Sequence, residues 1–349
     1  METLWSSIIK GNIHKVIAIL PEGTRYVSGE LSGTSTWATT VKLLVKLPDG
    51  SQKKLFFKYA IDQGAEALTA GEYYSAVVIN EALSGFVPRP VGKGKFDAGN
   101  ALVYFFLGEF HDMDPSIAPE PASFMSKIAT IHRTTSANSM FGFHVPTACG
   151  KMERTVTWEE SWAKSFTHQL KDVIKYDNQT NRRWPEYDAA CKQLIDVVIP
   201  RLLGALQSDG RKITPSLIHG DLWENNVRTY TETGEAVLFD PGCTYAHNEM
   251  EFGTWRCTWA RYFKNPVYME AYQTHIKPSE PVEEWDDRNR LYSIPPYLID
   301  SAGHAGSASR KIAYNEMLYL CEKYGPLNNL EKYDPQRLQE LMSDLSINS

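Results

Sequence analysis

Short segments in the first third of the chain have apolar side chains at every second position, which is the period of a β-strand with one buried face. Between Thr40 and Leu47 the apolar residues fall on one face, and Lys42 and Lys46 fall on the other. Residues 48–51 (PDGS) favour a tight turn, so Lys54 to Tyr59 is expected to return as the next strand. Further strands are expected at Arg25 to Ser28 and Ala101 to Leu107, with a loop of small residues from Gly29 to Trp37.

In other segments the apolar residues recur every three or four positions, which is the period of a helix. One helix is expected over about residues 64–84, and its inward row consists of Leu68, Glu72, Ser75, Ile79 and Leu83. From Pro121 onward the pattern is mostly helical, and a last helix is expected to begin at Asp334-Pro335 and to bury Leu338, Leu341, Met342 and Leu345. The order of elements predicts an α+β fold with two lobes. Residues 1–110 form an N-terminal lobe with a five-stranded antiparallel sheet and one main helix, and residues 111–349 form a mostly helical C-terminal lobe.

Two short apolar strands within residues 216–242 each lead to an acidic residue. Asp221 follows the first strand, Asn226 comes five residues later, and Asp240 ends the strand at residues 236–239. Phosphoryl transfer needs one carboxylate to accept or orient the proton of the acceptor hydroxyl. It also needs a second carboxylate and an amide oxygen to hold Mg²⁺ on the nucleotide phosphates. Asp-Pro-Gly alone is typical of an ordinary turn, but a histidine, these three residues and their order match the catalytic layout of kinases.

A lysine and a glutamate upstream fit the same interpretation. Lys58 lies on the strand face opposite Leu55, Phe57 and Tyr59, and Glu72 lies on an otherwise apolar or small helix face. A lysine among aromatic residues can simply extend to solvent. In a kinase it instead pairs with a helix glutamate and contacts the nucleotide phosphates. We therefore expect a Lys58–Glu72 pair.

The small-residue loop contains a candidate phosphate-binding sequence, Ser32-Gly33-Thr34-Ser35. Backbone N–H groups in such loops can approach phosphate oxygens. The sequence matches neither a Gly-x-Gly-x-x-Gly pattern nor a Walker motif, so a plain hairpin loop is the alternative.

Composition narrows the class of protein. The chain has 349 residues, a net charge of −6 and a pI near 5.9, which argues against a nucleic-acid-binding surface. No apolar run of membrane-spanning length and no signal-peptide pattern is present, so a cytoplasmic protein without a membrane partner is expected. The five cysteines have no Cys-x-x-Cys spacing and are expected to be buried thiols rather than zinc ligands.

Two features separate the chain from ordinary protein kinases and favour the small-molecule branch, of the aminoglycoside and choline kinase type. Gly220 replaces the arginine of the protein-kinase catalytic loop, and no Ala-Pro-Glu segment follows Asp240. More narrowly, the chain resembles the fructosamine kinase family, also called ketosamine or protein-ribulosamine 3-kinases. The resemblance rests on residues 219–227 (HGDLWENNV), 239–241 (FDP), 141–144 (FGFH), Trp158-x-x-x-Trp162-x-x-x-Phe166 and Tyr245-x-His247-x-Glu249. Residues 248–290 look most like fungal members.

The resemblance implies an enzyme that uses ATP and Mg²⁺ to phosphorylate the 3-hydroxyl of a ribulosamine or fructosamine on lysine. The product would then decompose and free the amine, so the substrates would be glycated proteins or small glycated amines. Asp221 would be the catalytic base, and Asn226 and Asp240 would hold Mg²⁺. Lys58 would hold the phosphates and Glu72 would position it. Trp223 is a candidate wall for the sugar or the lysine stem, and a buried loop aromatic is its alternative. His247 and Glu249 are candidates for the acceptor site, with local hydrogen bonding as their alternative.

Two other functions stay open on the sequence. One is a kinase of the aminoglycoside or choline kinase type with another hydroxyl acceptor. The other is a nucleotide-binding pseudokinase that recruits partners. The sequence does not show whether ribulosamine or fructosamine is preferred. The extra hydroxylated carbon of fructosamine requires a different pocket shape but does not require a different sequence motif.

Overall fold

The computed structural model describes residues 10–34, 37–61, 64–99, 101–114, 116–150, 152–326 and 330–337. The chain forms two compact units. Unit 1 comprises Met1–Pro119, Val145–Glu153 and Asn226–Cys243, and unit 2 comprises Glu120–His144, Arg154–Asn225 and Thr244–Ser349. The division of the chain at residues 110 and 111 stays a prediction. The predicted last helix lies almost entirely outside the described residues.

Unit 1 is built on the expected five-stranded antiparallel sheet, with strand order β1-β2-β3-β5-β4. Its strands are β1 (Arg25–Thr34), β2 (Thr39–Lys46), β3 (Gln52–Ile61), β4 (Pro90–Asp97) and β5 (Leu102–Glu109). The predicted loop from Gly29 to Trp37 is wrong over its first half, because β1 continues to Thr34. There Gly29 pairs with Leu43 and Gly33 with Thr40, so these small residues belong to the edge strand that pairs with β2.

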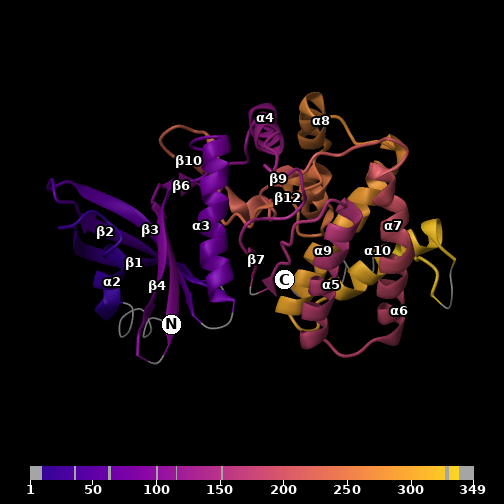
Figure 1. Ribbon diagram of the computed structural model, residues 1–349, viewed down its shortest axis with the longest axis horizontal. Coiled ribbons are helices and arrows are strands. Elements are labelled where there is room, and N and C mark those ends of the chain that lie inside the picture. The colour runs from indigo at the N-terminus through magenta and orange to yellow at the C-terminus, as the bar shows by residue number, and fades with distance from the viewer. Residues whose placement is uncertain are drawn as a thin grey trace. The chain divides into compact units, whose positions relative to one another are not determined.

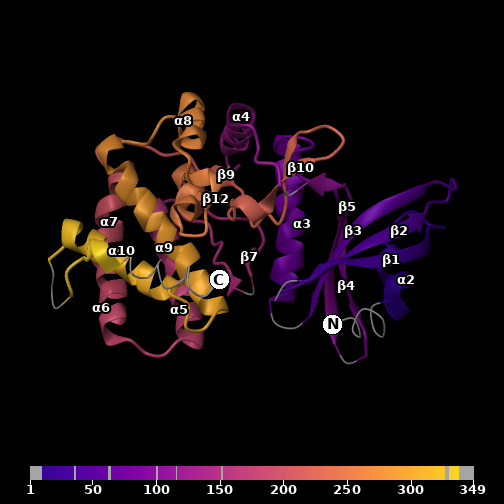
Figure 2. The ribbon, with the colours of Figure 1, turned by 180° about the vertical axis from the view of Figure 1, so that it is seen from behind.

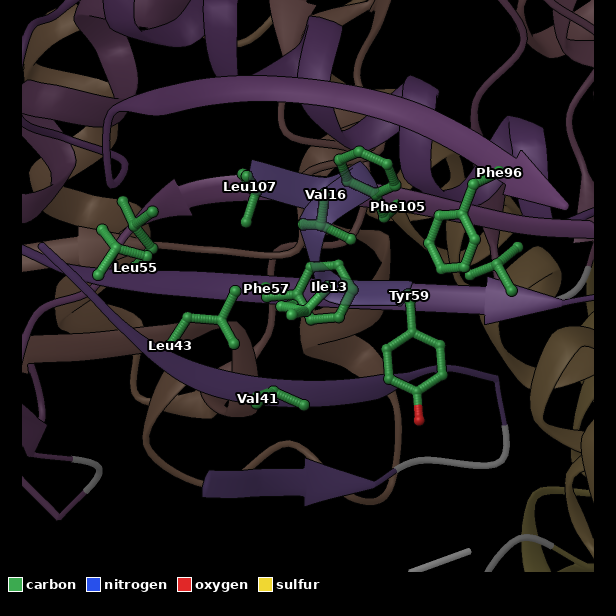
Figure 3. Packing of buried hydrophobic residues seen from close by; sticks show 12 residues of the cluster. Ile13, Val16, Val41, Leu43, Leu55, Phe57, Tyr59, Phe96, Phe105 and Leu107 are labelled. Carbon is green, nitrogen blue, oxygen red and sulfur yellow. The ribbon is translucent and has the colours of Figure 1, made fainter. Parts of the chain in front are cut away.

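The two faces of this sheet have different covers (Figure 1). The short helix α2 (Ile13–Ile17) places Ile13 and Val16 over Phe57 and its apolar neighbours on one face (Figure 3). The long helix α3 (Ala65–Ala82) packs on the other face, where Ala60 and Ala65 are buried together. Successive residues of β3 point to opposite faces, so Lys58 points to the α3 side.

The rest of unit 1 consists of short strands. These are β6 (Met113–Asp114), β7 (Ala148–Cys149), β8 (Met152–Glu153), β10 (Val227–Tyr230) and β11 (Ala236–Leu238). The β10–β11 hairpin pairs with β6 in one sheet, and β7 pairs with β8 in another. A hydrogen bond joins β11 to the segment between α3 and β4, since Leu238 N–H donates to Phe86 O at 2.8 Å.

Unit 2 is mostly helical, as expected (Figure 2). Its α-helices are α4 (Pro121–His132), α5 (Trp162–Thr180), α6 (Pro185–Gln193), α7 (Ile199–Leu202), α8 (Pro266–His275), α9 (Trp285–Gly303) and α10 (Ser309–Tyr324). A 3₁₀ segment, Asn248–Arg256, packs against α9, and the strands β9 (Ser216–Ile218) and β12 (Thr244–Ala246) pair in antiparallel fashion. No helix in the described ranges is long and apolar enough to cross a membrane.

A glycine sets how closely α3 approaches the segment before β7. A Cβ built on Gly71 would lie 2.8 Å from the carbonyl oxygen of Pro146 and 2.9 Å from the Cα of Thr147. Both contacts are with backbone, which has little freedom to move away. Only glycine therefore fits this position of the helix without a shift of the chain.

We predict that Gly71→Ala lowers the free energy of unfolding by about 1–3 kcal/mol, the usual cost of overpacking, although alanine favours helices. Chemical denaturation monitored by circular dichroism measures this. Gly204→Ala is the matched control, because a Cβ at Gly204 meets nothing within 4 Å and its effect should stay within about 0.5 kcal/mol. A Gly71→Ala protein as stable as the wild type would contradict the close approach.

Candidate active site

The Lys58 ammonium lies between two carboxylates in unit 1. Its Nζ is 2.7 Å from Glu72 Oε2 and 3.0 Å from Asp240 Oδ1. Lys58 and Glu72 are only 6% and 5% exposed. The predicted Lys58–Glu72 pair is therefore present, and the structure adds Asp240 as a second partner. Three segments far apart in the sequence, β3, α3 and the end of the β10–β11 hairpin, meet at this one ammonium group.

Burial and charge act against each other at this pair. Burial alone would lower the pKa of Lys58, but the carboxylates of Asp240 and Glu72 raise it above its ordinary value. Burial raises the pKa of Glu72, and the charge of Lys58 opposes this rise. Lys58 consequently stays a cation at neutral pH, able to bind phosphate oxygens, and Glu72 restricts where the ammonium can lie.

The β10–β11 hairpin brings Asn226 and Asp240 to the same end of unit 1. Val227 pairs with Leu238, and Phe239 N–H donates to Asn226 O at 3.2 Å, so Asp240 is the next residue along. Asp240 has a φ of +54°, which is uncommon for a residue with a side chain, and its side chain is 42% exposed. The strained turn thus presents the carboxylate to solvent while it also contacts Lys58.

This donor set fits a magnesium ion. Mg²⁺ prefers oxygen ligands and usually takes only one or two carboxylates from a protein, with the remainder from phosphates and water. Asn226 and Asp240 supply one amide oxygen and one partly exposed carboxylate in unit 1. Within the described ranges, no group of three or more His, Cys, Asp and Glu residues is placed to hold a metal.

The candidate phosphate-binding residues lie at the end of β1. Ser32 and Gly33 pair with β2, where Ser32 Oγ donates to Thr40 Oγ1 at 3.2 Å and Thr40 Oγ1 donates to Gly33 O at 3.1 Å. Thr34 is the last residue of the strand, and Ser35 lies outside the described residues. A phosphate-binding role for these four residues stays a prediction.

Asp221 lies in unit 2, in the loop that follows β9. Glu251, whose role the sequence does not predict, holds the start of this loop. Its carboxylate accepts hydrogen bonds from His219 N–H at 2.5 Å and Gly220 N–H at 3.0 Å. Burial alone would raise the pKa of Glu251, but hydrogen bonds from His132 and from the His219 backbone hold it below its usual value.

Side chains from other parts of unit 2 fix the rest of this loop. Arg154 Nη2 donates to Gly220 O at 2.6 Å, and Trp255 Nε1 donates to Leu222 O at 2.9 Å. The buried carboxylate of Glu224 accepts from the backbone N–H groups of Arg261 and Phe263 at 2.5 and 3.1 Å. Asp221 and Trp223 are half-buried between these anchors. The loop around Asp221 is therefore held rigidly on both sides of the carboxylate.

The sequence and this geometry agree with the comparison with protein families. The family model described as fructosamine kinase matches residues 37–315. The chain belongs to the fructosamine kinase family. The match contains Lys58, Glu72, Asp221, Asn226 and Asp240, whereas the candidate phosphate-binding residues 32–35 lie before it.

Curated members of the fructosamine kinase family are similar over part of their length. A chloroplastic protein-ribulosamine 3-kinase of rice (Oryza sativa subsp. indica) is 29% identical over 227 residues, which cover 64% of this chain and 61% of the rice protein. The ketosamine-3-kinase of the mouse (Mus musculus) is 30% identical over 186 residues, covering 52% of this chain and 53% of the mouse protein. The chain thus spans about three fifths of the length of the rice relative that it matches.

Solved structures of similar fold include both branches expected from the sequence. A fructosamine-3-kinase from Haemophilus somnus 129PT superposes with a TM-score of 0.68 at 16% identity, covering 90% of this chain and 98% of that one. An aminoglycoside phosphotransferase superposes with a TM-score of 0.56 at 16% identity, covering 88% of this chain and 98% of that one. These similarities show the kinase-like fold of this member of the fructosamine kinase family.

The structure places His247 and Glu249 of this fructosamine kinase family member in the interior of unit 2. His247 is 0% exposed, and its ring nitrogens lie 2.8 Å from Tyr292 Oη and 2.9 Å from Ser279 Oγ. Glu249 makes a two-point ion pair with Arg288, with distances of 2.7 and 3.1 Å. The geometry favours the alternative of local hydrogen bonding for both residues, because no ring nitrogen of His247 faces solvent.

We predict that Glu251→Ala lowers the free energy of unfolding by about 3 kcal/mol, because it leaves the buried N–H group of His219 and the partly buried N–H group of Gly220 without this acceptor. Glu251→Gln keeps one acceptor oxygen and should cost less. Urea denaturation of both variants measures the difference. Glu283→Ala, at an exposed position of unit 2, is the control and should change stability little. Equal stability of Glu251→Ala and the wild type would contradict this anchoring role.

We also predict a pH dependence of stability from His247. Burial lowers the pKa of His247 to about 4, against 6.5 for an exposed histidine, with Glu249 opposing the shift. Between these two pH values the unfolded state binds a proton that the folded state does not, so acidification destabilises the fold, by up to about 3 kcal/mol. Denaturation between pH 7 and 4 should show a flatter profile for His247→Gln than for the wild type. Identical profiles would show that His247 does not titrate in this way.

Proposed function

We propose that the protein is an ATP- and Mg²⁺-dependent ketosamine 3-kinase, which phosphorylates the 3-hydroxyl of a ribulosamine or fructosamine carried on a lysine amine. The observation that carries the proposal is the Lys58 ammonium held 2.7 Å from Glu72 and 3.0 Å from Asp240, in a chain of the fructosamine kinase family. Burying an ammonium and its carboxylate partners has a desolvation cost that often exceeds the gain from their attraction, so such a group is commonly functional. In kinases a lysine paired in this way binds the nucleotide phosphates. The names of the rice protein-ribulosamine 3-kinase and the mouse ketosamine-3-kinase support a ketosamine as the acceptor.

Each residue has a separate role in this proposal. Lys58 binds the phosphates and Glu72 fixes its position, while Asn226 and Asp240 hold Mg²⁺. The metal neutralises charge on the phosphate oxygens when it is bound. Asp221 accepts or orients the proton of the sugar hydroxyl as that oxygen attacks the terminal phosphorus of ATP, and the bond from this phosphorus to the bridging oxygen breaks so that ADP leaves.

The remaining candidate residues differ in whether they can reach a ligand. Trp223 is half-buried next to Asp221 in the sequence and contributes a wall for the sugar or the lysine stem. Backbone groups of Ser32, Gly33, Thr34 and Ser35 line the phosphates. His247 and Glu249 are left out of the acceptor site, because both are buried and bonded within unit 2.

The acceptors would be glycated proteins or small glycated amines. A phosphate at the 3-position is a good leaving group, so the product would decompose and free the lysine amine. The biological outcome that we propose is therefore deglycation, in the cytoplasm.

The test is incubation of the protein with ATP, Mg²⁺ and either ribulosyl-lysine or fructosyl-lysine, followed by ³¹P NMR. We expect a new sugar-phosphate signal with at least one of the two. Transfer to an aminoglycoside or to choline, with none to either ketosamine, would overturn the proposed acceptor class. Magnesium-dependent ATP binding without transfer to any of these acceptors would overturn the enzyme proposal and favour a pseudokinase.

For the catalytic base, we predict that Asp221→Asn lowers kcat by at least about 10²–10⁴-fold, the usual cost of losing a general base, with little change in nucleotide affinity. Steady-state kinetics on the better ketosamine and calorimetric titration with ADP measure the two effects. Glu232→Gln, at an exposed position of the β10–β11 hairpin, is the control and should retain activity. Near-normal turnover in Asp221→Asn would remove Asp221 from its proposed role.

A further inference from the structure

A buried serine of α3 binds the segment that follows Asp240. Ser75 Oγ accepts a hydrogen bond from Cys243 N–H at 2.9 Å, and both side chains are 0% exposed. The Cys243 thiol also lies 3.9 Å from Ser75 O. The serine thus makes its contact outside its own helix.

This is not the usual behaviour of a hydroxyl in a helix. Ser and Thr side chains inside helices commonly bond to the carbonyl oxygen four residues earlier. Thr69, also buried in α3, does so, since its Oγ1 donates to Ala65 O at 2.8 Å. Ser75 instead receives a hydrogen bond from a backbone group 168 residues away in the chain.

The hydrogen bond to Ser75 holds one end of the strained turn around Asp240. Asp240 has a φ of +54°, and a non-glycine residue keeps such a conformation only when its surroundings hold it there. On the preceding side, Phe239 N–H donates to Asn226 O at 3.2 Å. On the following side, Cys243 N–H donates to Ser75. The turn that carries the Asp240 carboxylate is therefore fastened at both ends.

The position of Ser75 on α3 links this turn to Lys58. Glu72 and Ser75 are three residues apart, so they lie on the same face of the helix. Through Glu72, α3 fixes the ammonium of Lys58, and through Ser75 it fixes the segment after Asp240. One face of α3 thus fixes the position of the Lys58 ammonium and of the turn that carries the Asp240 carboxylate.

We propose that Ser75 is a positioning residue for Asp240, and that its hydroxyl is required for full affinity for a magnesium-bound nucleoside diphosphate. The inference rests on the nucleotide-binding part of the proposed function and not on the identity of the sugar acceptor. Groups that orient a metal ligand without contacting the metal typically contribute 10–100-fold to metal affinity. Removal of the hydroxyl leaves the Cys243 N–H buried without this acceptor, and the turn relaxes toward an unstrained backbone.

The experiment is calorimetric titration of ADP into wild type, Ser75→Ala and Thr69→Val, once with excess Mg²⁺ and once with EDTA. We expect Ser75→Ala to bind ADP about tenfold more weakly than the wild type when Mg²⁺ is present, and equally well when it is absent. Thr69→Val removes a buried hydroxyl from the same helix without touching the turn, so it should match the wild type in both conditions. Titration of Mn²⁺ followed by electron paramagnetic resonance should show the same order of affinities in the presence of ADP.

The outcomes separate this inference from the proposed function. A wild type that binds no ADP with Mg²⁺ would overturn both. A wild type that binds it, with Ser75→Ala equal to it or weakened equally with and without Mg²⁺, would overturn the role of Ser75 alone. If Ser75→Ala does not fold, Ser75→Cys takes its place. That variant keeps the side-chain size, replaces the hydroxyl by a weak acceptor, and should show the same selective loss.

Discussion

The buried ammonium group of Lys58 in unit 1 must be neutralised by carboxylates. An unpaired charge away from water is very costly, so Lys58 is compatible with its position only if carboxylates lie beside it. Glu72 and Asp240 meet this need at 2.7 and 3.0 Å. This requirement brings together a strand, a helix and a hairpin end that are separated by up to 182 residues. The same requirement leaves a cation and a partly exposed carboxylate together, which is what phosphates and a metal ion need.

Buried carboxylates in unit 2 accept hydrogen bonds from main-chain N–H groups, whereas those in unit 1 neutralise an ammonium group. Glu251 accepts hydrogen bonds from the main-chain N–H groups of the two residues before Asp221, and Glu224 accepts from the N–H groups of Arg261 and Phe263. A carboxylate that accepts from N–H groups forms stronger hydrogen bonds than a neutral acceptor. The loop is consequently rigid before any ligand binds, and a preorganised catalytic group loses less freedom in the transition state.

The polar residues near the catalytic sequence differ sharply in what surrounds them. Asp240 is 42% exposed in a strained turn, whereas His247 is fully enclosed with both ring nitrogens engaged. In the sequence the two residues are only seven positions apart. Spacing therefore gave candidate residues in this segment but did not separate side chains that face solvent from side chains that are enclosed in the interior.

Alternation by itself predicted four strands of the sheet, and the helical period predicted the helical unit, because these periods record which face of each element is buried. The five-stranded antiparallel sheet and the Lys58–Glu72 pair were predicted from these patterns together with the kinase-like order of elements, whereas β4 (Pro90–Asp97) was not expected as a strand. Motif order determined the fructosamine kinase family. Only the tertiary structure decided that β1 continues through the small residues to Thr34, that Asp240 joins Lys58, and that Glu251 and Ser75 hold the two key turns. These depend on hydrogen bonds between residues far apart in the chain, and a local pattern contains no information about which distant N–H group a side chain will meet.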